Sequence, residues 1–174
     1  MPEKVKRFYW DSDCFIKVIS NLMTPEAVEA RSNLELFFQD AIDGRAQIFT
    51  STVTITEVIR VEAFGIPPVT TPSDVRQKIV DLFEEPYITP IPLDPARAIE
   101  ARALRWQYTR LKTMDAIQIA SAVFAKVDVM HTYDGSGNKP GILSLDGLVG
   151  NPPLKIQVPR YTGGHQSSLI PPIS

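Results

Sequence analysis

The sequence predicts an α/β fold, a three-layer sandwich around a mostly parallel sheet. Short apolar runs alternate with segments of helical period, and short breakers rich in Pro and Gly join them. Parallel strands need helical crossover connections, so this alternation favours a parallel sheet. The 174 residues, 44% of them hydrophobic, are enough for one domain with its own core.

The first half of the chain predicts two strands and two helices. Residues 8–10 form an aromatic strand that ends at two acidic residues. Thr24 and Pro25 then start an amphipathic helix that stops at Gly44, because a capping hydroxyl followed by Pro is typical of a helix N-terminus. Residues 46–50 form the second strand, and Ser51 and Thr52 cap a helix that runs to about Phe64.

The second half repeats the alternation. A helix over residues 73–85 precedes a strand at 87–91, and Asp94 and Pro95 repeat the cap-then-Pro signature of a helix that reaches about Tyr108. Thr113 is predicted to cap a helix over 114–126 that is apolar almost all round and hence buried. The fourth strand is at 129–132, and weaker patterns mark a helical turn at 142–145 and a last strand at 154–158.

The predicted domain spans residues 1–159. Residues 160–174 are rich in Gly, Ser and Pro and are predicted to be a flexible tail. No run of eighteen apolar residues and no signal peptide is recognisable, so we expect a soluble, cytoplasmic protein without a membrane anchor.

Composition excludes several functional classes. Eighteen Lys and Arg against twenty Asp and Glu give a net charge of −2, so any binding of nucleic acid must rest on local charge. Cys14 is the one cysteine and there are two histidines, which excludes a disulfide framework and a Cys-based zinc site.

Four acidic residues are predicted to meet at one edge of the sheet. Asp11 follows the first strand, Asp134 follows the fourth, Asp115 lies in the first turn of the buried helix, and Glu57 lies in the helix after the second strand. Ligands of open parallel sheets bind at the carboxyl ends of the strands. Converging carboxylates repel one another unless a cation neutralises them, and oxygen ligands select Mg²⁺ or Mn²⁺. Such a site suits hydrolysis of a phosphodiester by an activated water.

Three of the four acids also have a simpler explanation, whereas Asp11 directly follows three aromatic residues at the edge of the sheet and needs a partner. Asp115 is favoured by the dipole of its helix, Asp134 before Gly135 is an ordinary turn residue, and Glu57 can lie on a solvated helix face. The joint pattern is what favours a functional site.

Four short motifs carry a family resemblance. The first is residues 9–16, an apolar strand followed by Asp11, Ser12 and Asp13, and the others are residues 54–58 with Glu57, residues 115–122, and residues 132–134. In order and spacing they resemble the motifs of PIN-domain ribonucleases, over about residues 8–136.

The resemblance implies a five-stranded parallel sheet and an endoribonuclease dependent on Mg²⁺ or Mn²⁺. It implies Asp11, Glu57, Asp115 and Asp134 as the catalytic acids, the three aspartates among them as metal ligands, and Ser12 and Asp13 as accessory residues. Compact members include VapC-like toxins of toxin–antitoxin pairs, so the resemblance further implies RNA as substrate, a cognate antitoxin and a homodimer.

Local positive charge is available for RNA. Residues 96–114 hold five cations against Glu100 alone. The candidates for RNA binding are Arg102, Arg105, Arg110 and Lys112, with Lys139 beside the Asp134 loop. The arginines can equally form a solvated face or an antitoxin contact. Trp106 lies among them, and its size favours a core position over a base-stacking platform.

Other roles for single residues and other protein classes are also considered. His131 is predicted to be a hydrogen-bonded core residue, and Cys14 lacks the paired histidine of a thiol nucleophile. The Asp11-Ser12-Asp13 run also looks like a haloacid-dehalogenase nucleophile motif, but Phe15 stands where Thr or Val is expected. A receiver domain needs a Lys at the end of its last strand, whereas Lys155 starts it. A non-cleaving PIN-like module that binds RNA or protein, and an RNA-processing nuclease that is no toxin, are the remaining alternatives.

Overall fold

The structure is a computed structural model and describes residues 4–20, 22–59 and 71–163. Helices and strands alternate along the chain, as predicted. The elements are β1 (Lys6–Trp10), α1 (Ser12–Val18), α2 (Pro25–Ile42), β2 (Ala46–Ser51), α3 (Thr52–Glu57), α4 (Ser73–Glu84), β3 (Ile88–Ile91), α5 (Pro95–Gln107), α6 (Thr113–Ala125), β4 (Val129–His131), the 3₁₀ turn η1 (Ile142–Leu145) and β5 (Ile156–Gln157).

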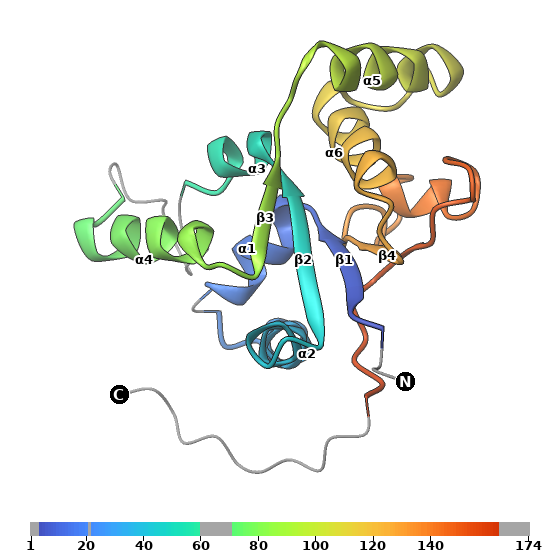
Figure 1. The fold of residues 1–174 in the computed structure, drawn as a ribbon. Coiled ribbons are helices and arrows are strands. Elements are labelled where there is room, and N and C mark those ends of the chain that lie inside the picture. Colours follow the sequence, from blue (N-terminus) through green and yellow to red (C-terminus); the bar gives the residue numbers. More distant parts are fainter. Residues whose placement is uncertain (1–3, 21, 60–70, 164–174) are drawn as a thin grey trace.

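The sheet has five strands in the order β3-β2-β1-β4-β5, and every neighbouring pair is parallel. The chain moves outward from β1 through β2 to β3, then crosses back so that β4 pairs with the other side of β1 (Figure 1). The predicted α/β class with a parallel sheet is confirmed. The strand order reverses between β1 and β4, which is where ligands bind in sheets of this type.

Two apolar layers cover the two faces of the sheet. Side chains of a strand alternate between faces, and in β1 Phe8 and Trp10 pack on one side while Tyr9 packs on the other. The Trp10 side includes Phe15 of α1 and residues of α2 and α4, and the Tyr9 side includes α5 and α6 (Figure 1). Tyr9, Trp10 and Phe15 are completely buried, so the end of β1 is a rigid platform for the residue that follows it.

The predicted helix caps are mostly confirmed. Thr24, Ser51 and Asp94 accept hydrogen bonds from the backbone of the helices that they precede. Thr113 is a correction, because the chain is still extended at Lys112, which is the N-cap, and Thr113 is the first helical residue. Among the described residues, no helix is long and apolar enough to cross a bilayer.

The helix predicted over residues 52–64 is shorter than expected. α3 ends at Glu57, and Val58 leaves the helical conformation with only 1% of its surface exposed. Five β-branched residues in six make α3 a weak helix by local preference. Burial of Val58 in the core therefore decides where it ends. Residues 60–70, which include the predicted end of this helix at about Phe64, lie outside the described residues.

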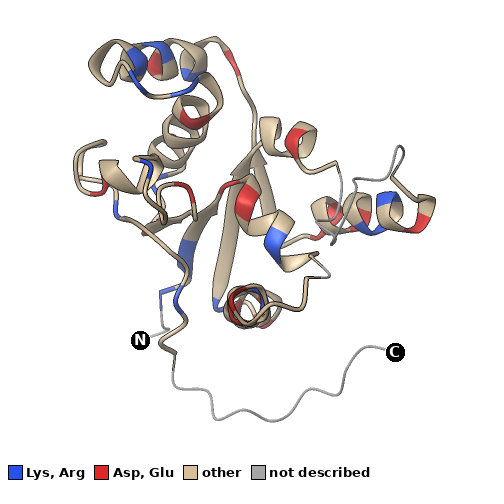
Figure 2. Cartoon of the chain, turned by 180° about the vertical axis from the view of Figure 1, so that it is seen from behind, with Lys and Arg blue, Asp and Glu red and all other residues tan. Residues whose placement is uncertain are grey.

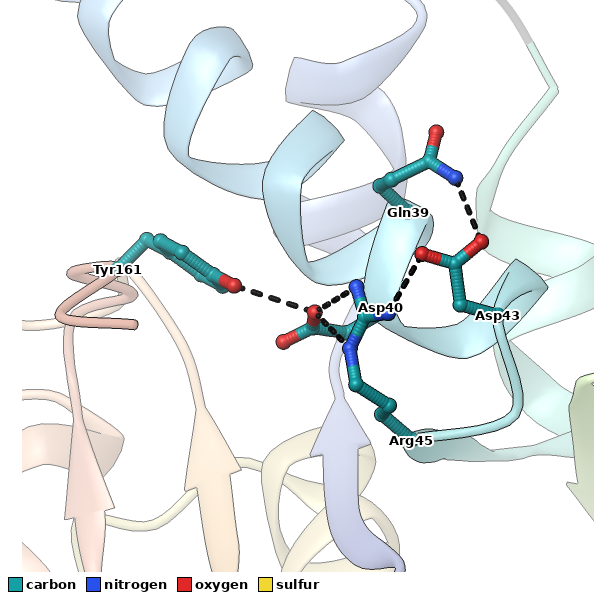
Figure 3. A network of polar contacts seen from close by, with 5 residues as sticks. All are labelled: Gln39, Asp40, Asp43, Arg45 and Tyr161. Carbon is teal, nitrogen blue, oxygen red and sulfur yellow. Dashed lines mark hydrogen bonds and ion pairs between the residues drawn. The ribbon is translucent and has the colours of Figure 1, made fainter. Parts of the chain in front are cut away.

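The chain remains packed beyond the predicted domain boundary at residue 159. The Tyr161 ring lies edge-on against Phe37 of α2 at 5.2 Å, its hydroxyl donates to Asp40 at 3.1 Å, and its amide donates to the side chain of Asn33 at 2.9 Å. Arg45 holds Asp40 from the other side in the same network (Figure 3). The rest of the predicted tail, residues 164–174, lies outside the described residues.

Candidate active site at the carboxyl ends of β1 and β4

Four elements bring acidic side chains to the reversal of strand order. Asp11 directly follows β1 and is the N-cap of α1, and Asp134 comes three residues after the end of β4. Asp115 lies in the first turn of α6, and Glu57 is the last residue of α3. Figure 2 shows acidic segments of the ribbon where the central strands end.

These side chains line one small cavity of about 170 Å³. The lining residues are Asp11, Ser12, Asp13, Glu57, Lys112, Asp115, Gln118, Asp134 and Ile142. The structure thus brings together all four acids that the sequence singled out and both accessory residues. Five carboxylates face a single cation, Lys112, in this lining.

Asp11 is the most deeply buried of the acids, with 4% of its surface exposed. Its Oδ1 accepts from the amide of Cys14 at 3.2 Å, and its Oδ2 accepts from the hydroxyl of Thr132. Burial and the neighbouring charge of Asp13 raise the pKa of Asp11 to about 7, against the lowering effect of these hydrogen bonds. The charged form of Asp11 is therefore costly, and a nearby cation would stabilise it.

Asp134 lies close enough to Asp115 to affect the pKa of Asp115. Burial, then the charge of Asp134, raises the pKa of Asp115, while Lys112 opposes the shift. Oδ2 of Asp134 accepts from the amide of Ile142 at 2.8 Å, and the amide of Asp134 donates to Thr132 at 3.0 Å. These bonds fix Asp134 although it precedes a glycine-rich loop.

Glu57 is oriented by two donors. The hydroxyl of Ser12 and the side-chain amide of Gln118 both donate to its Oε2, at 2.8 and 3.0 Å. Gln118 is itself held by the hydroxyl of Tyr9 at 2.5 Å. The simpler explanation of Glu57 as a solvated surface acid does not hold, because its carboxylate is half-buried and faces the cavity.

The chemistry of the donors fits a hard divalent cation, since Mg²⁺ and Mn²⁺ prefer oxygen ligands and the cavity is lined by five carboxylates. Within the part of the chain that the structure describes, however, no three His, Cys, Asp or Glu side chains surround a common point as metal ligands do. The acids line one cavity, but metal coordination further requires that their oxygens point to a common centre. The hydrogen bonds above explain the difference, because both oxygens of Asp11 and one oxygen each of Glu57 and Asp134 are turned toward protein donors.

The predicted RNA-binding cations separate into two groups. Arg110 and Lys112 line a cavity of about 360 Å³ that also includes Asp115 and Asp134, so they lie beside the acids. Arg102 and Arg105 line a different hollow, between α5 and α6, and Figure 2 shows Lys and Arg along α5. Lys139 is exposed and lines neither cavity.

Three other residues have clear outcomes. Trp106 is 71% exposed beneath the guanidinium of Arg102, 4.9 Å from its ring centre, so the expected core position is wrong. One ring nitrogen of buried His131 accepts from Trp10 at 3.2 Å, and burial lowers the pKa of His131 to about 3, which confirms a structural histidine. Burial also raises the pKa of the Cys14 thiol, which argues against a thiolate nucleophile.

Sequence reasoning missed residues that hold the acids in place. Gln118 orients Glu57, Thr132 donates to Asp11, and Gly141 lies so close to Asp134 that a Cβ there would be 2.4 Å from its carboxylate. A signal for Gln118 existed, since a polar residue in an otherwise apolar buried helix needs hydrogen-bond partners. Gly141 gave none, because its closeness to Asp134 depends on how the loop folds back.

The molecule is thus an open parallel α/β domain with an acidic cavity at its switch point. The sequence model of the PIN domain matches residues 9–138, most of the chain, and the chain belongs to the PIN domain family. PIN domains are generally nucleases, so the fold is of a nuclease type, and they typically use divalent metals. No curated protein matches the chain.

Proposed function

We propose that this chain is an endoribonuclease that depends on Mg²⁺ or Mn²⁺. The observation that carries the proposal is the cavity in which Asp11, Glu57, Asp115 and Asp134 meet from four separate segments of the chain. Burial and neighbouring carboxylates raise the pKa values of Asp11 and Asp115, which costs stability, so the clustering of the acids favours a functional role over a structural one.

Asp11, Asp115 and Asp134 are the residues that would hold the metal. A divalent cation held by these residues would neutralise the three carboxylates and would supply the polarisation of a phosphate oxygen and the lowered pKa of water that phosphodiester hydrolysis needs. Lys112, in the same cavity, is placed to bind a phosphate oxygen of the substrate.

The protein itself orients Glu57, which is the proposed general base. Ser12 and Gln118 hold Oε2 of Glu57, which leaves its other oxygen to take a proton from the attacking water. The water oxygen bonds to phosphorus as the bond from phosphorus to one sugar oxygen breaks, and that oxygen takes a proton from solvent. The products are a phosphate monoester and a hydroxyl.

The test is cleavage of labelled RNA by the purified chain with Mg²⁺ or Mn²⁺, beside EDTA. Asp115→Asn is the inactive variant. Asp81→Asn is the matched control, because Asp81 is exposed on α4, accepts a hydrogen bond from Gln77 and does not line the acidic cavity. We expect cleavage that needs metal, persists in the control and falls at least about 10²-fold in Asp115→Asn. A matched DNA strand checks the preference for RNA.

Equal cleavage by wild type and Asp115→Asn would reveal a contaminating nuclease and overturn the assignment. Thermal unfolding with Mn²⁺ gives an independent readout, because a ligand that binds only the folded state raises its stability. No cleavage together with no stabilisation by Mn²⁺ would favour the non-cleaving binding module.

The nuclease is further proposed to be a VapC-like toxin that acts as a homodimer and is restrained by a cognate antitoxin. Exposed Trp106 and Ile99 on α5 support this proposal, since they offer apolar area to a protein partner. Expression in a bacterial host should arrest growth, and Asp115→Asn should relieve the arrest. Sedimentation of the purified chain tests the homodimer, and growth unaffected by the wild-type chain would favour an RNA-processing nuclease.

A further inference from the structure

A further cavity lies over the face of the sheet that carries Phe8 and Trp10. It has a volume of about 460 Å³, and it shares no lining residue with the acidic cavity or with the cavity beside it. Its volume is in the range of sites for small organic molecules, ~300–1,000 Å³. The cavity is therefore a separate candidate binding site.

Three neighbouring strands supply its floor. Phe8 of β1 lies beside Val129 of β4, and His131 of β4 lies beside Gln157 of β5. Paired residues of a parallel ladder point to the same face and side chains alternate along each strand, so these four side chains share one face. α2 covers this face at β1, where the ring of Phe37 packs edge-on against Phe8 at 4.9 Å. The cavity thus lies between α2 and the chain that follows β5.

Aromatic rings form two sides of the cavity. Phe8 and Phe37 are each only 6% exposed, and residues 160–163 form the opposite wall. The ring of Tyr161 is fixed there, because it packs edge-on against Phe37 and its hydroxyl donates to Asp40 (Figure 3). Aromatic side chains favour stacked or edge-on contact with another ring. These walls therefore favour a planar apolar group as the body of the ligand.

The floor carries a buried donor that lacks a partner. Nδ1 of His131 accepts from the indole of Trp10, so the proton of this neutral imidazole lies on Nε2, on the side of the ring away from Trp10. Nε2 is buried and has no hydrogen-bond partner among the described residues. Buried donors are normally paired. His131 lines the cavity, so its N–H favours a ligand that carries a hydrogen-bond acceptor.

The rim of the cavity carries uncompensated positive charge. Lys6 and Arg160 are both exposed, and neither side chain forms an ion pair within the described ranges. The two carboxylates of the lining, Asp40 and Asp128, are each already paired with a cation. Two free cations at one opening attract an anion.

We infer that this cavity binds a small planar organic anion, an aromatic ring that carries a carboxylate or a phosphate. The ring lies against Phe37 and Tyr161, an acceptor atom faces Nε2 of His131, and the anionic group lies at Lys6 and Arg160. The inference does not rest on the proposed ribonuclease activity, since the acids of the catalytic site take no part in it.

The first test uses the two tryptophans of the chain as reporters in NMR spectra of ¹⁵N-labelled protein in EDTA. The indole N–H of Trp10 donates to His131, whereas Trp106 is exposed on α5 and is an internal control. The probes are adenosine monophosphate and indole-3-carboxylate, and the comparison compounds are adenosine, indole and inorganic phosphate. We expect the Trp10 signal alone to shift with one or both probes, and the comparison compounds to bind at least about tenfold more weakly.

The two probes distinguish a phosphate from a carboxylate as the anionic group. A Trp10 signal that neither probe moves at millimolar concentration would overturn the inference. Shifts that indole or adenosine produces equally well at the same concentration would overturn it too, because the charge would then play no part.

The second test removes the charge of the rim. The double variant Lys6→Ala, Arg160→Ala is compared with Arg76→Ala, Lys78→Ala, which removes two exposed cations of α4. We expect the Kd of the effective probe to rise at least about tenfold in the first variant alone. Equal Kd values for the two folded variants would overturn the inference, whether or not the wild-type chain cleaves RNA.

Discussion

Gly141 leaves no room for a side chain beside Asp134. An added Cβ would lie 2.4 Å from the carboxylate, whereas a Cβ on Gly137 would meet nothing within 4 Å. We expect Gly141→Ala to displace Asp134 and to lower RNA cleavage about 10²-fold, because displacements of about 1 Å at a reacting group have costs of this size. Gly137→Ala is the control in the same loop. Equal kcat/KM for the two variants would show that the position of Asp134 does not matter.

We expect the charge of Asp115 to lower the stability of the folded protein while it supports RNA cleavage. Its pKa is raised in the folded state, so its charge destabilises the fold at every pH above its ordinary value of 3.8. In EDTA at pH 8, Asp115→Asn should therefore have a higher Tm than wild type, and Mn²⁺ should stabilise it less. Asp81→Asn should show neither change in a thermal scan. A lower Tm for Asp115→Asn in EDTA would contradict the repulsion among the acids.

The acids of the site were predictable from sequence because each follows a recognisable strand or helix start. Asp11 and Asp134 follow apolar strands, and Asp115 follows the start of the most apolar helix. Their hydrogen-bond partners were not predictable, because Thr132 and Gln118 are far from Asp11 and Glu57 in sequence. Trp106 was misplaced because aromatic size predicts burial only on average.

At the scale of elements, the segment after β5 packs against α2 through Tyr161. Tyr161 contacts Phe37, Asn33 and Asp40, and Arg45 completes the network (Figure 3). We expect Tyr161→Phe to lower the free energy of unfolding by about 1 kcal/mol through its lost hydrogen bond. Tyr161→Ala should lower it by roughly 2–3 kcal/mol, since the ring contact is lost too. Urea unfolding measures both, and no change in Tyr161→Ala would show that the segment is not docked in solution.

Elements with strong local signals were predicted well. The starts of α2 and α5 carry a cap followed by Pro, and both helices begin at that Pro. The end of α3 and the exact start of α6 had no such signal. Burial of Val58 and the extended chain at Lys112, which are tertiary features, decide them.

At the scale of the whole molecule, His131 makes folding sensitive to acid. Its pKa is about 3 in the folded state because of burial, against an ordinary value of 6.5. Between these values the unfolded chain binds more protons, so the free energy of unfolding falls as the pH falls below 6.5. Relative to His131→Phe, wild type should lose about 1.4 kcal/mol per pH unit there.

Urea unfolding of both proteins from pH 5 to 8 measures this difference. The comparison separates His131 from Asp11, whose raised pKa acts in the opposite direction and is common to both proteins. A difference between the two proteins that does not vary with pH would mean that His131 has the same pKa in the folded and the unfolded chain.

The strand order also governs when the molecule can begin to work. β1 is the first strand to be made but lies in the middle of the sheet, and its neighbour β4 is the fourth of the five strands, with Asp11 and Thr132 separated by 121 positions. Contacts between such distant positions form late, because a long loop must be closed first. A nascent chain still short of β4 carries Asp11 and Glu57 without Thr132 or Asp134. Protein synthesis therefore delays assembly of the site, because a chain on the ribosome that ends before Asp134 cannot hold the complete set of acids.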